Sequence, residues 1–259
     1  MPEPQPSGGF EWTQAPWGRA LRCRPLEAAA DHLFTAGDLS LRTDDEWVVV
    51  AAAMGVTSKD LLLIRQVHES SVAVVTHDRT GAWDRPAADV IVSDDERAAI
   101  AVRVADCVPV LLAEETGRAV AAVHAGWRGT AARAAIAGVE AMWERFGVRP
   151  QRLIAAVGPS IGPCCYEVGE GTRQAFRDAG HHEDLLRAWF APRPAGKYHL
   201  DLWRATRDQL EGAGIPASRI HSADLCTLTH AGFFHSYRAD GKRAGRMAAV
   251  IRPAPVRPS

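Results

Sequence analysis

The sequence contains no long hydrophobic run and no excess of charge of one sign. Its longest uninterrupted apolar stretch, residues 47–54, has eight residues, far fewer than the ~18 to 20 that a membrane-spanning helix requires. The 30 basic and 31 acidic residues leave a formal net charge of −1. Non-specific binding to nucleic acid depends on a net positive field. We therefore expect neither a membrane protein nor a nucleic-acid-binding protein.

Cysteine is scarce and its number is odd, at five in 259 residues. The opening residues, MPEPQPSGGFEW, contain no basic residue followed by an apolar run, so we expect no secretory signal and a cytoplasmic protein. These conditions do not favour a framework of disulfides. They favour free thiols, metal ligands or a nucleophile as the roles of the cysteines.

The composition, 47% apolar and 24% charged, is close to the average of soluble globular proteins. No linker, repeat or change in composition divides the chain. We expect a single α/β domain of layered helices and mixed β-sheets over residues 19–251. A loosely ordered N-terminal arm with room for one early strand is expected over residues 1–18, and a Pro-rich tail over residues 252–259.

Turn and capping residues predict the boundaries of the elements. Thr43 is expected to cap a helix that ends at Gly55, and Thr130 to cap a second helix that Gly147 ends. Further helices are expected over 169–179, around Leu185 and over 201–212. Short apolar runs predict strands at 61–67, 72–75, 89–92, 99–104, 108–112, 119–123, 153–157, 220–223 and 247–251.

Three residues that can bind a metal, His68, Cys107 and His124, each stand where a predicted strand stops. Ligands bind at strand ends in open α/β sheets. One thiolate and two imidazoles form a zinc set with a free fourth position, where the pKa of a bound water falls towards ~7. The spacings of 39 and 17 positions are too long for a structural zinc motif.

Each of these residues also has a plainer interpretation. A histidine at a strand end is commonly a hydrogen-bonded surface or core residue, and a free cysteine is commonly a small buried side chain. His124 departs most from its surroundings, because it separates a hydrophobic strand from Gly-Trp-Arg-Gly. Asp106 fits a turn residue and a carboxylate that supports a neighbouring imidazole equally well.

Other polar residues are less distinctive. Arg128 stands at the start of a predicted helix and can hold an anion there, or it is a surface arginine. Ser236 and Arg238 follow an aromatic pair, and a hairpin turning near residues 240–241 is the plain interpretation of that region. We expect structural roles for the remaining cysteines and solvent exposure for an adjacent histidine pair; these residues are Cys164, Cys165, Cys226, His181 and His182.

These segments together resemble the bacterial laccase-domain family, whose members are also described as multicopper polyphenol oxidases, purine nucleoside phosphorylases or peptidoglycan editing factors. The resemblance runs from about residue 26 to residue 251, with the motifs in the family's order. The motifs are RQVH (65–68), ADCVPVLL (105–112), AAVHAGWRGT (121–130), GPSIGPCCYEVG (158–169), YHLDLW (198–203) and LCT…FFHSYRADGKRAGRMAAVI (225–251).

The resemblance implies a fold like that of cytotoxic-necrotizing-factor-type cysteine hydrolases. It implies that His68, Cys107 and His124 form the catalytic metal site, with Zn²⁺ as the expected ion and Cu²⁺ as the alternative. The implied activity is phosphorolysis of adenosine, inosine, guanosine and methylthioadenosine, with adenosine deamination as a side activity. The substrates are then a small purine nucleoside and phosphate, and we expect Arg128, Arg238 and Ser236 to contact them.

Three other functions stay open. One thiolate and two imidazoles also resemble a blue-copper set, but a laccase needs several coppers, and the ten histidines are scattered without His-X-His repeats. Cys107 with His124 as its base is a hydrolase arrangement that could edit peptidoglycan precursors. A non-enzymatic protein whose fold the metal stabilises is the third.

The chain departs from the family pattern in two places. The family has a Thr-Arg pair after its Phe-Thr, where this chain has Ala36 and Gly37, so an expected phosphate ligand is missing. An extra His235 and Ala239 in place of an arginine alter the last motif, and the substrate preference is expected to differ. The arginines that could supply the missing charge are Arg42, Arg65 and Arg128.

Overall fold

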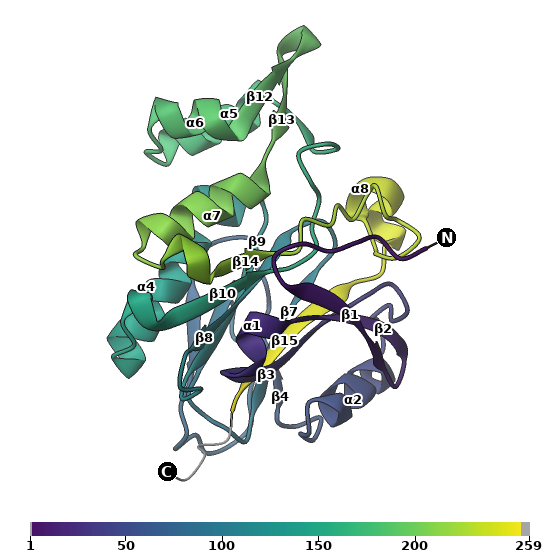
Figure 1. The fold of residues 1–259 in the computed structure, drawn as a ribbon, viewed down its shortest axis with the longest axis vertical. Coiled ribbons are helices and arrows are strands. Elements are labelled where there is room, and N and C mark those ends of the chain that lie inside the picture. Colours follow the sequence, from purple (N-terminus) through teal and green to yellow (C-terminus); the bar gives the residue numbers. More distant parts are fainter. Residues whose placement is uncertain (1, 255–259) are drawn as a thin grey trace.

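A computed structural model describes residues 2–254, and its backbone forms two six-stranded sheets and a smaller three-stranded one (Figure 1). The first sheet has the order β1-β2-β3-β15-β7-β4, with β4 parallel to β7 and the other neighbours antiparallel. Its strands are β1 (Phe10–Ala15), β2 (Gly18–Cys23), β3 (Ala30–Thr35), β4 (Leu61–Leu63), β7 (Ala99–Val104) and β15 (Met247–Pro253).

The second sheet has the order β14-β10-β8-β9-β6-β5. Every residue of its central strands β8 and β9 is buried, which explains why these segments read as continuous apolar runs rather than as an alternating pattern. Its strands are β5 (Val72–Val75), β6 (Val90–Ser93), β8 (Val108–Glu114), β9 (Val120–Ala125), β10 (Leu153–Val157) and β14 (Ile220–Ser222).

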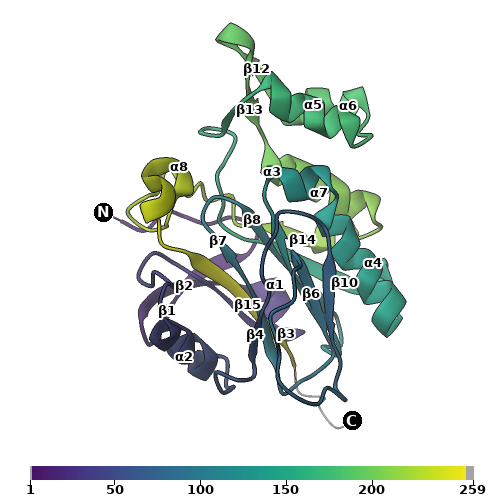
Figure 2. The ribbon, with the colours of Figure 1, turned by 180° about the vertical axis from the view of Figure 1, so that it is seen from behind.

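The two large sheets pack face to face, with β7 and β15 of the first against β8 and β9 of the second. Helix α2 (Asp44–Ala53) covers the outer face of the first sheet, and α4 (Ala134–Phe146) and α7 (Leu202–Gly212) lie over the second, on the opposite side of the molecule (Figure 2). Separate clusters of buried apolar side chains fill the three spaces between these layers. The chain is thus a layered α/β domain, and the predicted class is confirmed.

The small sheet, β11-β13-β12, projects from one end of the molecule together with α5 and α6 (Figure 1). None of the helices within residues 2–254 has the length and apolar character needed to cross a bilayer. The elements not yet placed are β11 (Glu167–Gly169), β12 (Phe190–Arg193), β13 (Lys197–Leu200), α1 (Arg24–Glu27), α3 (Trp127–Ala131), α5 (Glu170–Asp178), α6 (Glu183–Trp189) and α8 (Tyr237–Asp240).

Most predicted elements occur where the pattern placed them. Thr43 begins α2 through a capping box with Glu46, and β7 and β10 have the predicted bounds. The helix expected from Thr130 is wrong in its start: Thr130 lies inside α3, and α4 begins only after Arg133 adopts a left-handed conformation with φ 63°. The hairpin expected near residues 240–241 is also wrong, because α8 ends there at Gly241, which has φ 59°.

The two predicted ends are partly built into the first sheet. Residues 10–15 of the expected arm form β1, and residues 252–253 of the expected tail extend β15. Residues 255–259 of that tail lie outside the described residues. His181 is buried rather than solvated, with its Nε2 donating to the carbonyl of Ala131 at 2.8 Å, whereas His182 is exposed as expected.

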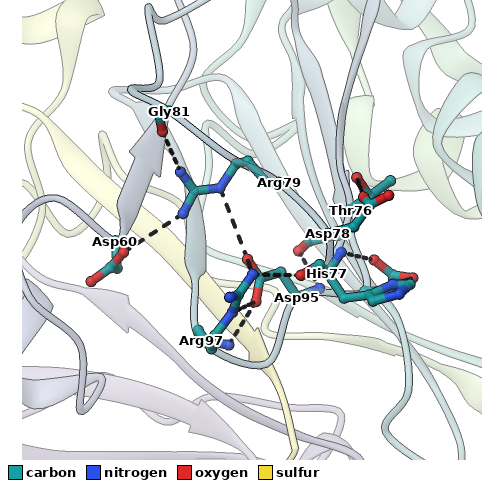
Figure 3. Close-up of polar contacts among 10 residues, drawn as sticks. Asp60, Thr76, His77, Asp78, Arg79, Gly81, Asp95 and Arg97 are labelled. Carbon is teal, nitrogen blue, oxygen red and sulfur yellow. Dashed lines mark hydrogen bonds and ion pairs between the residues drawn. The ribbon is translucent and has the colours of Figure 1, made fainter.

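A charged network fastens the loop after β5 to the turn between β6 and β7 (Figure 3). The buried Asp95 accepts hydrogen bonds from Arg97 at 2.8 and 3.0 Å and lies 3.9 Å from Nε of Arg79. Arg79 in turn reaches Asp60 at 3.6 Å and the carbonyl of Gly81 at 3.2 Å. Asp95 is thus a buried carboxylate whose partners are arginines, and its network joins the loops at this end of β6.

Candidate metal centre

The structure brings His68, Cys107 and His124 together at one end of the two packed sheets. Their ligand atoms lie within 4.8 Å of one another, and the two imidazole rings meet edge to face with centroids 4.8 Å apart at 84°. His68 follows β4, Cys107 lies in the turn between β7 and β8, and His124 is in β9. Distant parts of the chain thus supply one compact set of a sulfur and two nitrogens.

The backbone around the three side chains is strained. His68 has φ 65° and Asp106, immediately before Cys107, has φ 82°. Non-glycine residues in this region cost of the order of 1–3 kcal/mol each and are common at functional sites. Gly126 provides the space for the thiol, since a Cβ at that position would lie 2.8 Å from Sγ of Cys107. The left-handed backbone at His68 and Asp106 therefore lowers the stability of the fold, and it positions the side chains of His68 and Cys107.

Asp89 orients the centre, and sequence reasoning missed it. Its Oδ1 accepts a hydrogen bond from Nδ1 of His124 at 2.8 Å, which leaves Nε2 free to face the thiol. Its Oδ2 accepts from the backbone N–H groups of Glu69 at 2.7 Å and Val67 at 3.2 Å, on both sides of His68. One fully buried carboxylate thus fixes both histidines, as the outer partners of metal-binding histidines do.

Asp106, the carboxylate that the sequence offered for this role, has other partners. Its Oδ1 accepts from the hydroxyl of Thr227 at 2.6 Å, and its Oδ2 accepts from the backbone N–H of Arg238 at 2.6 Å. Of the two interpretations that the sequence left open for Asp106, support of a neighbouring imidazole is therefore wrong. Asp106 instead binds the segments that carry Thr227 and Arg238 and holds them beside Cys107.

The charges at the centre reinforce one another. Burial alone raises the pKa of the Cys107 thiol, but the charge of His124 and hydrogen bonds from both histidines lower it well below the ordinary value. Burial likewise opposes ionisation of His124, yet Cys107 and Asp89 raise its pKa. Hydrogen bonds from His124 and Glu69 also overcome burial at Asp89 and lower its pKa. A thiolate is thus favoured at Cys107, and a thiolate is the form that binds metals.

Two adjoining cavities open onto the centre. The first, of about 700 Å³, is lined by five cationic side chains and contains no carboxylate in its described lining. Within residues 2–254 these cations form no ion pair. Burial, and then the charges of Arg85 and Arg246, lower the pKa of Arg103. Uncompensated positive charge of this kind attracts anions. The cationic residues are Arg42, Arg103, Arg128, Lys242 and Arg246.

The second cavity, of about 400 Å³, is lined largely by aromatic and aliphatic side chains. It shares five lining residues with the first cavity: His68, Ala105, Cys107, Arg128 and Tyr237. A flat apolar ligand with an anionic end would fit across both cavities, because one is apolar and the other is basic. The aromatic and aliphatic lining residues are Trp127, Ile161, Tyr166, Leu202 and Tyr237.

The predicted contact residues do not all reach the cavities. Arg128 lines both cavities, with its guanidinium 4.3 Å from the centre of the Trp127 ring. Arg238 lines the second, 5.2 Å from the centre of the Tyr166 ring. Ser236 is buried, and its hydroxyl oxygen caps α8 by accepting from the N–H of Ala239 at 3.2 Å. Ser236 lines neither cavity.

Arg42 is one of the three arginines that could supply the charge missing at Ala36 and Gly37. It lines the first cavity, and its guanidinium donates to the carbonyl of Arg243. A Cβ at Gly37 would lie 3.0 Å from the carbonyl oxygen of Phe233, so a larger residue there requires a small shift of this neighbour. Arg65 is in a bridge with Ala87 and does not line the cavity. Of the three candidate arginines, Arg42 and Arg128 line the basic cavity.

The fold and the site together describe a layered α/β protein with a candidate Cys-His-His metal centre, which faces one basic and one aromatic cavity. Residues 28–254 match the family described as multi-copper polyphenol oxidoreductase laccase, and the chain belongs to this family. The resemblance seen in the sequence is confirmed.

The curated relatives carry names from purine metabolism. A purine nucleoside phosphorylase from Deinococcus radiodurans is 41% identical over 202 residues, covering 78% of this chain and 74% of that protein. An adenosine deaminase from an unidentified prokaryote is 39% identical over 217 residues, covering 81% of each. The structure of YlmD from Geobacillus stearothermophilus superposes with a TM-score of 0.82 at 29% identity, covering 96% of this chain and all of that one (100%).

The residues of the centre fit a metal ion. Their donor set is one sulfur and two imidazole nitrogens, the spread of these atoms suits a single ion, and Asp89 already orients one imidazole towards the thiol. Three protein ligands leave a coordination position open, which is typical of catalytic rather than structural zinc sites. The centre could therefore hold a single metal ion beside the two cavities.

Proposed function

We propose that the protein is a zinc-dependent purine nucleoside phosphorylase, active on adenosine, inosine, guanosine and methylthioadenosine. The observation that carries this proposal is the pairing of a basic and an aromatic cavity at the Cys-His-His centre. Phosphate needs the first kind of surface and a purine ring the second. The relative from Deinococcus radiodurans is named a purine nucleoside phosphorylase, as is YlmD from Geobacillus stearothermophilus, which is 38% identical over 194 residues, and both names support the same activity.

In this reaction a phosphate oxygen attacks C1′ of the ribose while the bond from C1′ to the purine nitrogen breaks. The bonding electron pair leaves with the base, which gains one proton while the attacking hydrogen phosphate loses one, and the products are ribose 1-phosphate and the free purine. Arg42, Arg103 and Arg128 hold the phosphate and offset its charge as it approaches the sugar. Tyr166 and Trp127 stack on the departing base and exclude water from the reacting bond.

His68, Cys107 and His124 would hold the Zn²⁺ ion, with Asp89 keeping His124 in the correct orientation. When bound, the ion supplies positive charge and Lewis acidity beside the reacting groups. Two imidazoles and one thiolate occur in both zinc and blue-copper sites, but blue-copper sites usually add an axial methionine. No methionine lines either cavity within the described residues, which favours zinc over the alternative Cu²⁺. Elemental analysis of protein purified without added metal separates these two ions.

The test is turnover of a nucleoside panel with and without phosphate, followed by chromatography. Phosphate-dependent release of ribose 1-phosphate is expected, and Cys107→Ala abolishes it. Cys23→Ala, which removes a buried thiol from the first sheet, is the matched control and keeps the activity. The proposal is overturned when no nucleoside in the panel gives phosphate-dependent products.

Adenosine deamination is the second activity that we propose for the same cavities. The relative named adenosine deaminase is 39% identical over 81% of the chain. Water would replace phosphate as the nucleophile, attack C6 of the purine and release ammonia, so inosine is the product. Inosine formation that is independent of phosphate and lost in Cys107→Ala supports this activity. A wild-type protein that releases no ammonia from adenosine contradicts it.

A metal-free hydrolase is favoured by one observation, the chain of contacts from Asp89 through His124 to Cys107. This is the order of groups in a Cys-His-Asp nucleophile. The expected fold resemblance to cytotoxic-necrotizing-factor-type cysteine hydrolases stays a prediction. An acyl-enzyme on Cys107, detected by mass spectrometry after exposure of metal-free protein to a peptidoglycan precursor, would establish this function, and its absence excludes Cys107 as that nucleophile.

A further inference from the structure

Three further cysteines meet at a second place, in segments that the Cys-His-His centre does not use. The sulfur atoms of Cys164, Cys165 and Cys226 lie within 4.8 Å of one another. Cys164 and Cys165 lie in the loop between β10 and β11, and Cys226 follows β14. Considered as a sequence, the adjacent pair predicts a structural role, but the fold adds a third sulfur from 61 positions beyond Cys165 (226 − 165).

The two segments are fastened to each other by their backbones. Ser160 and Cys226 form a parallel β-bridge, in which the N–H of Ser160 donates to the carbonyl of Leu225 at 3.2 Å and the N–H of Thr227 donates to the carbonyl of Ser160 at 3.0 Å. Gly162 helps the close approach, since a Cβ there would lie 3.2 Å from Cβ of Cys226. The sulfurs are therefore held in place by the fold itself.

Donors surround the sulfurs as they surround thiolate ligands. The backbone N–H groups of Gly162 and Thr229 donate to Sγ of Cys226 at 3.2 and 3.5 Å. The hydroxyl of Thr229 lies 3.4 Å from Sγ of Cys164 and 3.3 Å from Sγ of Cys165. Burial opposes ionisation of Cys226, but these contacts lower its pKa, whereas burial and the neighbouring thiols raise the pKa of Cys164 to about 11.

The spacing of the sulfurs suits one ion better than a disulfide. Sγ of Cys164 and Sγ of Cys165 are 3.4 Å apart, beyond the ~2.05 Å of a covalent bond, and all five cysteines are free. Four ligands at ~2.3 Å around a tetrahedral ion lie about 3.8 Å apart, within the observed spread. Three neighbouring thiolates would repel one another, and a bound cation would offset their negative charges.

We propose that Cys164, Cys165 and Cys226 form a second metal site, which takes a thiophilic d¹⁰ cation, Zn²⁺ or Cu⁺. Three sulfurs without a histidine select such soft ions. Cys164 is exposed and gives the ion a path from solvent. The bound ion joins the loop that carries Ile161 and Tyr166, which line the aromatic cavity, to the segment in which Thr227 holds Asp106. The ion is thus a structural brace behind that cavity.

The test counts metal ions in the full-length protein, reduced and kept free of oxygen. Zn²⁺ and Cu⁺ are titrated in separate arms against chromophoric chelators specific for each ion. For the preferred ion, the wild-type protein is expected to bind one equivalent more than Cys226→Ser and one more than Cys164→Ser. Cys23→Ala is the matched control, because it removes a buried thiol that belongs to neither cluster. This variant is expected to bind as many equivalents as the wild type.

The exposed position of Cys164 keeps the test valid even when Cys226→Ser fails to fold. Cys107→Ala is expected to lose the other ion and retain the one at the three cysteines, so the two sites are counted independently. Equal stoichiometry of the wild type, Cys164→Ser and Cys226→Ser in both arms, with all thiols confirmed as reduced by a thiol assay, overturns the proposal. A difference in one arm identifies which of the two ions the site prefers.

Discussion

Asp89 and His124 are linked twice across one rung of the second sheet. The register of β6 on β9 pairs Val90 with Val123, and the N–H of His124 donates to the carbonyl of Asp89 at 2.8 Å. The side chains repeat this link, with Nδ1 of His124 donating to Oδ1 of Asp89 at 2.8 Å. The sheet thus sets the tautomer of a candidate metal ligand.

Asp89→Asn is expected to weaken zinc binding about 10- to 100-fold, the usual effect of losing the outer partner of a ligating histidine. The amide keeps the volume but removes the charge that orients His124. Zinc affinity is measured by chelator competition. Asp95→Asn is the control, because Asp95 is a buried carboxylate near the other end of β6 with arginine partners only (Figure 3). An unchanged affinity in Asp89→Asn would contradict the assigned role.

Local sequence was sufficient to name the three candidate ligands that the structure brings together, but not the residue that orients them. His68, Cys107 and His124 could be named because each follows or interrupts an apolar run that predicts a strand. Asp89 could not be assigned, because its partner is set by the antiparallel register of β6 and β9, which no local pattern contains. The only signal was an acidic residue directly before a fully buried strand.

The same limit applies to the fold. Elements such as α2 and β10 have local caps and apolar runs, and they were predicted well. The start of α4 was not predicted, because it depends on the left-handed backbone of Arg133. The side chain of Arg133 holds this conformation, with its Nη1 donating to the carbonyl of Ala179 at 2.8 Å. That contact joins residues 46 positions apart, and only the tertiary structure contains it.

Arg42→Met is expected to raise KM for phosphate while leaving KM for the nucleoside unchanged. Hydrogen bonds to charged groups contribute about 1.5–3 kcal/mol, so the increase is roughly 10- to 100-fold. Initial rates at varied phosphate and saturating inosine measure it. Arg204→Met, which breaks an exposed pair with Asp208, is the control with no expected change. Equal effects on the KM of both substrates would remove Arg42 from the phosphate site.

Gly126→Ala is expected to abolish tight zinc binding in a protein that still folds. The added Cβ would lie 2.8 Å from Sγ of Cys107 and 3.5 Å from the His68 ring, so the thiol must move out of the ligand set. Cobalt titration, read by the thiolate charge-transfer absorption, follows this loss. Gly171→Ala in α5 meets no atom within 4 Å and serves as the control. Normal cobalt spectra in Gly126→Ala would show that the thiol position is not critical.

His32 predicts how stability depends on pH. Its Nε2 accepts a hydrogen bond from the N–H of Cys23 at 2.9 Å, and its Nδ1 lies 3.1 Å from the carbonyl of Ala30, to which it can only donate. This buried ring is therefore neutral, because protonation would turn Nε2 from an acceptor into a donor facing another donor. Burial lowers the pKa of His32 to about 4, whereas the unfolded chain has an ordinary value near ~6.5.

Because the unfolded chain binds the proton first, stability falls as the pH falls from about 6.5 to about 4, by up to about 3 kcal/mol. Above this window His32 has no effect on the pH dependence. His32→Gln lacks the titrating group, so its free energy of unfolding is expected to vary less over the same range. Urea unfolding of both proteins at several pH values measures the difference, which isolates His32 from the other titrating groups. Parallel curves for the two proteins between pH 4 and 6.5 would mean that His32 does not titrate as its buried contacts require.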